Sequence, residues 1–329
     1  IKKNIPAVLL VSIAYLIRSE MLLLVLPMIC VAGVAKWGSE EHIFTKENRR
    51  KYLTVIGLIL IGILLGQITH QIAYGSEEWR TFTDFFNNRT ELYDFQQPPS
   101  YEEHKEFYEK IGLTESEKIL LDNYNFGMDE EIDQVMIGTI AEYAGKVKSA
   151  EISFWNKLSV KLRDYVYRFT HGKGVAGSDY PWNYGVMFGY LLAFATGIPG
   201  KYTEEKIQER GKGTYLKNVL GISWKLGLLF VVRTLLWMFI LMRDRAPERI
   251  THSLYLMELC VLGAMLFAHW QKICRLKSRR ILASAALVGY GAIALLILPE
   301  NVQRVSEKQA EREAVNSRFQ ELYGYFGNE

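Results

Sequence analysis

Long blocks of apolar residues alternate with short charged stretches along most of this chain. Apolar blocks of about 18 or more residues predict helices that cross a membrane. Blocks at or near that length cover residues 52–74, 182–199, 219–242, 252–270 and 281–298. Two shorter runs, 5–17 and 21–37, predict either a tight helical pair or one broken segment, and a charged break between them holds Arg18 and Glu20. The pattern predicts an all-α, polytopic membrane protein with about six to seven membrane segments.

The polar stretch 76–181 predicts a helical insert outside the membrane. A capping-box pattern from Thr114 to Glu117 opens one of its helices. Charge is divided unevenly within the insert, with 17 acidic and 5 basic residues before position 143 and 3 acidic and 7 basic residues after position 142. The two parts of the insert are therefore expected to have different surroundings.

Two further helices are predicted in the insert, from Asp129 to about Gly145 and from Glu151 to Thr170. The second carries apolar residues at helical spacing among its lysines and arginines: Trp155, Leu158, Leu162, Tyr165, Val166 and Phe169. This pattern fits an amphipathic helix on a membrane surface. It fits an ordinary helix packed on the acidic part of the insert equally well.

Positive charge in the short loops predicts the orientation of the membrane helices. Loop 38–51 holds four basic residues, loop 200–217 holds five and loop 271–280 holds five. Cytoplasmic loops are enriched in Lys and Arg, so these three loops are expected in the cytoplasm. Alternation of the helices then places the remaining segments outside: 18–20, 76–181, 243–251 and 299–329. The three arginines of the 243–251 turn oppose this rule.

These features divide the chain into four parts. They are N-terminal membrane helices (1–75), the extracytoplasmic insert with its juxtamembrane amphipathic helix (76–181), a block of four membrane helices (182–298) and an extracytoplasmic amphipathic helix (299–329). The first residue is Ile, an apolar run follows at once, and the last helical pattern has no stop signal. We expect a piece of a longer protein, with further parts before and after it.

Composition narrows the expected partners. Of 329 residues, 49% are apolar and 23% are charged, and the net charge is +3. No basic face for nucleic acid is present, so the lipid bilayer is the expected partner and nucleic acid is not. Cys30, Cys260 and Cys274 lie in or beside predicted membrane helices, which argues against a disulfide framework. The sequence shows no metal-ligand set, and the cofactor stays unknown, with a divalent cation left open.

Two charged residues stand inside predicted membrane helices, Arg233 and Glu258. Each costs roughly 2.5–3.5 kcal/mol at the centre of a bilayer, so such residues usually have a partner or a function. A rise of about 1.5 Å per residue puts both at similar depths below the turn, and antiparallel neighbours would let them meet. Two interpretations stay open: a buried ion pair that fixes helix register, and groups that line a polar cavity opening outward.

The turn itself carries four candidate phosphate-binding residues: Arg243, Arg245, Arg249 and His252. Guanidinium groups bind phosphate through paired hydrogen bonds, and the phosphate of a lipid would lie at this depth. Contact with anionic lipid headgroups explains the same residues equally well. Arg18 and Glu20 are expected on the same side of the membrane, either as a structural cap or as part of the same substrate-binding site.

The pattern IRSEMLLLVLP at residues 17–27 resembles the Arg-Pro-Glu element that precedes an apolar helix in bacterial C-type membrane glycosyltransferases, which use polyprenyl-phosphate sugars. Ser19 stands where that element has proline. The outward insert and the helix that leaves the last membrane segment also resemble this family, which includes O-antigen glucosyltransferases. Its catalytic carboxylate lies in a first extracytoplasmic loop, which would precede Ile1, so the catalytic residue stays unknown here.

The resemblance implies an integral glycosyltransferase of the bacterial cell membrane. It would transfer a sugar from a polyprenyl-phosphate donor to a cell-surface glycan on the extracytoplasmic side, with a base on the acceptor hydroxyl and cations at the leaving phosphate. Two alternatives stay open. One is a transporter or flippase for a lipid-linked glycan or small molecule, with Arg233 and Glu258 along its path. The other is a non-catalytic assembly protein whose insert binds a partner.

Overall fold

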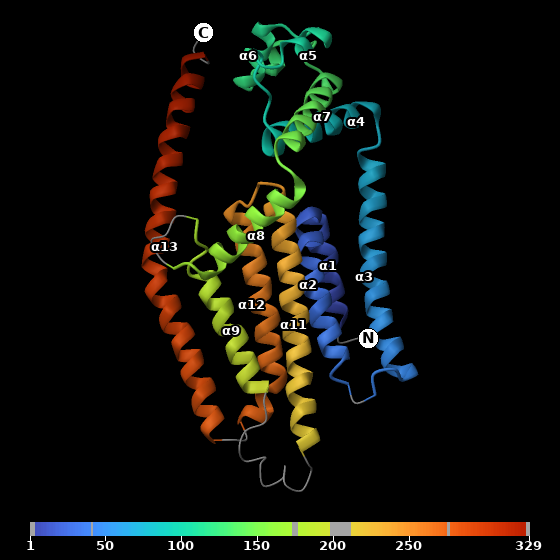
Figure 1. Ribbon diagram of the computed structural model, residues 1–329, viewed down its shortest axis with the longest axis vertical. Coiled ribbons are helices and arrows are strands. Elements are labelled where there is room, and N and C mark those ends of the chain that lie inside the picture. Colours follow the sequence, from blue (N-terminus) through green and yellow to red (C-terminus); the bar gives the residue numbers. More distant parts are fainter. Residues whose placement is uncertain (1–3, 41, 173–176, 198–211, 275–276, 327–329) are drawn as a thin grey trace. The chain divides into compact units, whose positions relative to one another are not determined.

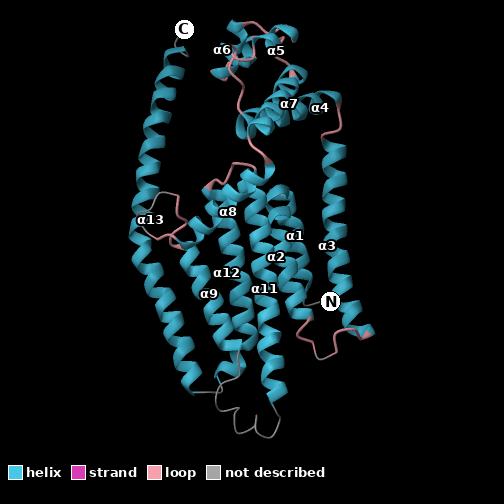
Figure 2. Ribbon diagram, in the orientation of Figure 1, coloured by secondary structure: helices cyan, strands magenta, loops and turns pink. Residues whose placement is uncertain are grey.

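The computed structural model describes residues 4–40, 42–172, 177–197, 212–274 and 277–326, and these form helices and loops with no strand (Figures 1 and 2). The predicted all-α class is confirmed. The elements in chain order are α1 (Ile5–Ile17), α2 (Ser19–Trp37), α3 (Lys46–Ala73), α4 (Glu77–Thr90), the π-helix η2 (Glu91–Gln96), α5 (Lys105–Lys110), α6 (Glu115–Asp122), the 3₁₀ turn η3 (Phe126–Met128), α7 (Gln134–Glu151), α8 (Phe154–Thr170), α9 (Trp182–Gly197), α11 (Lys212–Met242), α12 (Glu248–Cys274) and α13 (Lys277–Phe326).

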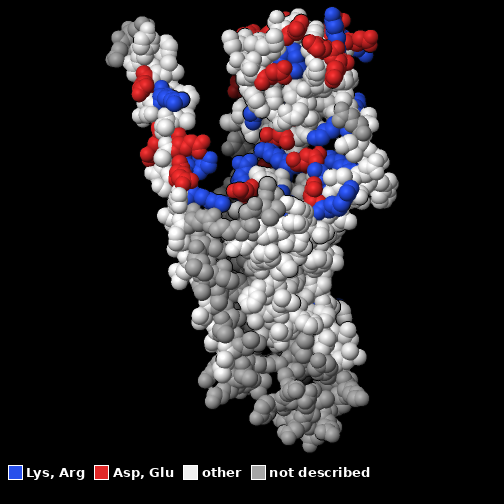
Figure 3. Space-filling view, turned by 60° about the vertical axis from the view of Figure 1, so that its left-hand side comes forward, with Lys and Arg blue, Asp and Glu red and all other residues white. Residues whose placement is uncertain are grey.

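Four helices of the described part are long and apolar enough to cross a membrane: α2, α3, the Val219–Met242 part of α11 and the Glu248–Ala268 part of α12. Of the other predicted spans, 182–199 forms α9, which has 16 residues and is short for a crossing. The predicted span 281–298 is helical, but most of its side chains are not among those that the structure describes. In the view of Figure 3, charged side chains gather over the insert and its junction with the membrane helices, whereas the described surface beyond that junction is white.

The charged break in the first apolar stretch separates two packed helices. Arg18 adopts an extended backbone (φ −158°, ψ 88°) between α1 and α2, so the helix cannot continue through it. Helix α1 contacts both α2 and α3, and the Tyr15 hydroxyl donates a hydrogen bond to Gln67 Oε1 at 2.7 Å. The two short runs are therefore a tight helical pair. Their connection lies at the same end of the helices as the α11–α12 turn (Figure 1).

The insert has a hydrophobic core of its own. Its buried residues are Leu92, Tyr93, Tyr108, Leu113, Leu121, Ile132, Ile137, Ile140, Ala141 and Ala144. The predicted capping box at Thr114 and Glu117 is present. Helix α7 starts later than predicted, because Asp133 rather than Asp129 accepts hydrogen bonds from the first-turn amides. The sequence prediction did not include α4, although Trp79, Phe82 and Phe86 recur in it at helical spacing; the helix packs on α7, yet none of its residues is fully buried.

Helix α8 packs on membrane helices. It contacts α11 and α9, and its Tyr165 belongs to the same buried cluster as Leu229 and Trp237 of α11 and Leu254 of α12. The interpretation of this segment as a helix packed on the acidic part of the insert is therefore wrong. Two of its four cationic side chains, Lys157 and Lys161, reach the α11–α12 turn instead.

The chain separates into two compact units, Ile1–Leu266 and Phe267–Glu329. The second unit holds the end of α12 and α13. Helix α13 is continuous for 50 residues, although it contains Pro299. The predicted boundary between a membrane segment ending at 298 and a separate helix beginning at 299 does not appear as a break in the helix.

Candidate functional site

The turn between α11 and α12 is shaped by its acidic residue. Asp244 has a positive φ of 57°, a left-handed conformation that ends helices and that Asp tolerates better than most residues. Its amide donates to the Leu241 carbonyl at 2.9 Å, which closes the last turn of α11. Pro247 then precedes the first residue of α12. This geometry presents Arg243, Asp244 and Arg245 in succession toward the insert.

Asp244 gathers three lysines from two helices of the insert. Its carboxylate lies 2.7 Å from Lys157 Nζ and 2.8 Å from Lys161 Nζ, both on α8, and 3.4 Å from Lys148 Nζ on α7. Burial favours a higher pKa for Asp244, but the hydrogen bonds from Lys157 and Lys161 outweigh it and lower the pKa to about 2. One carboxylate therefore ties the insert to the end of α11 and leaves an excess of positive charge around itself.

The two arginines beside Asp244 bind the π-helix η2. Arg245 forms an ion pair with Asp94, and its guanidinium lies 5.6 Å from the centre of the Phe95 ring. Arg243 lies 4.9 Å from the same ring, and Lys148 donates to the Phe95 carbonyl at 2.6 Å. Arg245, which the sequence analysis predicted to bind phosphate, therefore already has an anionic partner in Asp94.

A cavity of about 410 Å³ opens at this junction. Its lining brings together η2, the end of α7, the start of α8 and the end of α11, and its charged members are Lys148, Lys157, Arg243, Glu91 and Asp244. The aromatic rings of Phe95 and Phe154 complete two of its walls. Three cations against two carboxylates give a lining that favours an anion next to the membrane helices.

A second cavity, of about 500 Å³, lies in the insert and has the opposite character. It is formed by α4 and the first residue of α7, and its charged lining residues are Glu77 and Glu78. No lysine or arginine lines it among the described residues. A phosphate group would meet only negative charge there, so the junction cavity is the better candidate for phosphate.

The structure brings Arg233 and Glu258 together beneath the turn. Both side chains are fully buried, and Arg233 Nε lies 3.2 Å from Glu258 Oε2. Four aromatic rings surround the guanidinium: Tyr165, Phe169, Trp237 and Tyr255, at 5.3, 4.1, 5.4 and 5.3 Å from ring centre to Cζ. Neither described cavity is lined by this pair. The arrangement is that of a buried ion pair, and it does not show the outward-opening cavity that the sequence left as a second interpretation.

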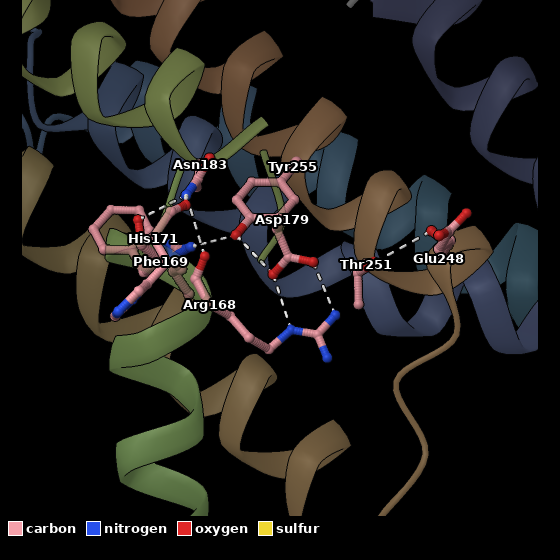
Figure 4. A network of polar contacts seen from close by, with 9 residues as sticks. Arg168, Phe169, His171, Asp179, Asn183, Glu248, Thr251 and Tyr255 are labelled. Atoms are coloured by element: carbon pink, nitrogen blue, oxygen red, sulfur yellow. Dashed lines mark hydrogen bonds and ion pairs between the residues drawn. The ribbon is translucent and has the colours of Figure 1, made fainter. Parts of the chain in front are cut away.

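A chain of polar contacts connects the Arg233–Glu258 ion pair to Asp179, in the loop before α9, and to Arg168 on α8. Tyr190 donates to Glu258 Oε1 at 2.8 Å, and Arg233 donates to the Tyr255 hydroxyl at 3.4 Å. Tyr255 in turn donates to Asp179 at 3.2 Å. Arg168 holds the same carboxylate through two hydrogen bonds of 2.9 and 2.8 Å (Figure 4). Two arginines and two carboxylates therefore alternate through α8, α9, α11 and α12 and the loop before α9.

The remaining predicted site residues lie apart from the cavity. Arg249 is exposed on the first turn of α12, and the ring of His252 packs against Trp182 with centres 5.2 Å apart. Arg18 and Glu20 are exposed at the α1–α2 break. Among the described residues, no hydrogen bond or ion pair joins Arg18 or Glu20 to the turn. Of the residues predicted to bind phosphate, only Arg243 lines the junction cavity.

Several residues of the site escaped the sequence analysis. Asp244 was overlooked because three arginines surround it in the sequence, and Asp179 because it lies in a loop without a motif. The spacing of Lys157 and Lys161, four residues apart on one helix face, is the signal that could have indicated a shared anionic partner.

The described residues contain no group of three or more His, Cys, Asp or Glu side chains that could hold a metal ion. In comparisons with known proteins, no protein-family model matches this chain, and neither a curated protein nor a solved structure matches it. The geometry of the junction is therefore the basis for a functional proposal.

Proposed function

We propose that this chain belongs to an integral membrane glycosyltransferase that takes its sugar from a polyprenyl-phosphate donor. The observation that carries the proposal is the junction cavity, in which Lys148, Lys157 and Arg243 converge beside the membrane end of α11. A volume of about 410 Å³ suits a phosphate with an attached sugar. The donor's isoprenoid chain would remain in the bilayer against the apolar helices.

The topology proposed for this function has about six to seven membrane segments and places the insert outside the cell membrane of a bacterium. Support comes from the three lysine- and arginine-rich loops expected in the cytoplasm. The insert, the α11–α12 turn and the α1–α2 break lie at one end of the helices, and the end of α2 and the start of α3 lie at the other (Figure 1). The acceptor would be a cell-surface glycan.

The cations of the cavity suit the leaving group of this reaction. As the bond between the sugar and the phosphate breaks, negative charge grows on the phosphate oxygens, and fixed positive groups stabilise it. Asp244 does not prevent this role, because each lysine ammonium has three N–H donors and Asp244 uses only part of them. The base that accepts the proton of the acceptor hydroxyl is not assigned to a residue.

The alternatives have less support in the geometry. A transporter or flippase would need polar groups along a path, whereas Arg233 and Glu258 are fully buried against each other. An assembly protein that binds its partner through the insert would not need a cationic cavity at the junction. The assembly-protein alternative predicts that removing a cavity cation leaves phosphate binding unchanged, whereas a flippase for a lipid-linked glycan would bind phosphate as well and is set apart only by the burial of Arg233 and Glu258.

Binding of undecaprenyl phosphate to the purified protein in lipid nanodiscs tests the proposal. Arg243→Gln is expected to weaken binding roughly 10-fold to 100-fold, because one charge-assisted hydrogen bond contributes about 1.5–3 kcal/mol. Arg243 is the decisive position, since Lys148 and Lys157 also hold Asp244 and their loss would loosen the junction. Titration followed by native mass spectrometry gives the affinity of each variant.

Arg163→Gln supplies the matched control, because Arg163 is exposed on α8 and does not line the cavity. The control is expected to bind like the unmodified protein. Uncharged undecaprenol and phosphatidylglycerol, tested as competitors, separate recognition of the isoprenoid phosphate from general attraction to anionic lipid. Equal affinities for Arg243→Gln and Arg163→Gln would rule out the proposed phosphate site.

A further inference from the structure

Helix α8 carries a stripe of apolar side chains on a side that does not touch the protein. The exposed fractions are 73% for Trp155, 48% for Leu162 and 51% for Val166. These positions are seven and four residues apart, so they fall on one face of the helix. An exposed apolar stripe of this kind marks a surface that meets either a membrane or another protein.

The protein-facing side of α8 carries several of its charged residues beside the buried Tyr165. Lys157 and Lys161 point to Asp244, and Arg168 binds Asp179. A helix on the surface of a water-soluble domain usually exposes its charged residues and does not direct them into the protein. With these charges directed inward, the outward apolar stripe is suited to an apolar medium.

A second exposed stripe on α8 is polar. Asn156, Arg163 and Thr170 are exposed and again recur every seven residues. Asn156 and Arg163 each follow an apolar-stripe residue by one position, and successive residues of a helix are rotated by about 100° around its axis. The polar stripe therefore lies beside the apolar stripe. The exposed side of the helix thus holds the apolar stripe and, beside it, the polar stripe, which is bordered on its other side by the exposed Val160 and Tyr167. An apolar stripe beside a polar one is the arrangement of a helix lying along a boundary between lipid and water.

Continuity with the membrane helices identifies the medium on the apolar side. Helix α8 packs directly on α11, and α11 contains a candidate membrane span whose Val231, Leu235 and Phe239 are also exposed. Tryptophan is a residue favoured at the level of lipid headgroups. We propose that α8 lies in the bilayer interface, with Trp155, Leu162 and Val166 in contact with lipid and Asn156, Arg163 and Thr170 in water.

This position sets the depth of the junction cavity. Lys157, which lines the cavity, is two residues from Trp155 on the same helix. The cavity then opens at the level of phosphate headgroups, where it would receive a phosphate carried by a lipid in preference to one on a soluble nucleotide. The proposed position of α8 in the bilayer interface does not depend on the proposed function, and only the inference about the ligand rests on that function.

Spin labels on single cysteines measure the depth directly. In a protein whose Cys30, Cys260 and Cys274 have been replaced by Ser, labels would be placed by Trp155→Cys, Leu162→Cys and Val166→Cys. The matched controls are Asn156→Cys, Arg163→Cys and Thr170→Cys, which are also exposed but lie in the polar stripe. In nanodiscs of phosphatidylcholine and phosphatidylglycerol, relaxation by dissolved oxygen reports lipid, and relaxation by a water-soluble nickel chelate reports water.

Labels of the apolar stripe are expected to be relaxed more by oxygen and those of the polar stripe more by nickel. Nickel access at all six positions would place α8 in water and overturn the proposal. If neither oxygen nor nickel relaxes the labels of the apolar stripe, the proposal is overturned as well, because a protein surface would then cover the stripe. Thermal unfolding of each labelled protein confirms that it is folded. If the apolar-stripe labels face lipid but the protein does not bind undecaprenyl phosphate, only the proposed function is refuted. If the protein binds undecaprenyl phosphate but these labels do not face lipid, only the proposed depth of α8 is refuted.

Discussion

Glu258→Gln is expected to destabilise the protein by about 3–5 kcal/mol. The substitution keeps an acceptor for Tyr190 but leaves the Arg233 guanidinium buried without its counter-charge, and an unpaired buried charge is costly. Arg233→Met is expected to cost a similar amount, because it leaves the Glu258 carboxylate unpaired. Unfolding of the detergent-solubilised protein by increasing fractions of a denaturing detergent gives the free energy for each variant.

The double variant Arg233→Met with Glu258→Gln decides what the pair does. Removing both charges together is expected to recover most of the lost stability, since a buried ion pair roughly balances its own desolvation. Arg80→Met, at an exposed position on α4, should change stability by less than about 0.5 kcal/mol. If the losses of the two single variants simply add in the double variant, Arg233 and Glu258 are not energetically coupled.

Asp244→Asn is expected to lower stability at neutral pH by about 2 kcal/mol. The pKa of Asp244 is lowered from 3.8 to about 2 in the folded protein, so ionisation of this carboxylate favours the folded state by that order. The contribution is complete above about pH 4 and is lost as pH falls toward 2. The difference in unfolding free energy between the unmodified protein and Asp244→Asn should therefore shrink toward zero over that range.

The same variant should loosen the junction between the insert and the membrane helices. Faster amide hydrogen exchange is expected around Lys148 and Lys157, which lose their shared partner. Asp164→Asn removes the same charge from α8, but its side chain is 48% exposed and 3.6 Å from Lys161, so it should have little effect. A pH-independent difference for Asp244→Asn would contradict the role assigned to its ionised carboxylate.

Much of the fold could be predicted because burial in a membrane leaves a strong pattern. Four of the helices that the apolar runs predicted are long and apolar enough to cross a membrane, and the capping-box pattern correctly predicted the helix start at Thr114. Helix α4 was not predicted, although the repeat of Trp79, Phe82 and Phe86 in an otherwise polar segment is a local signal for it. The start of α7 was missed because Asp129 and Asp133 are equally good caps in sequence, and only the packing of the insert selects Asp133.

The site was less predictable because its charges come from distant segments. Arg233 and Glu258 were found together because each is conspicuous in an apolar helix. The partners of the α11–α12 turn were not predicted, because they lie far from it in the sequence. Asp94 pairs with Arg245, and Lys148 pairs with Asp244, across long stretches of chain. Nothing in the local sequence distinguishes an arginine that pairs with a carboxylate, such as Arg245, from one that lines a cavity, such as Arg243.

The alternating charges of the buried network have an electrical consequence. In their ionised forms Arg168 and Arg233 balance Asp179 and Glu258, so the network has no net charge. A single elementary charge moved across a membrane gains or loses about 2.3 kcal/mol per 100 mV. If the network moves as one body, the energies gained and lost by its two positive and two negative charges cancel to first order. The packing of α8, α9, α11 and α12 around it is therefore expected to be the same in energised and de-energised membranes.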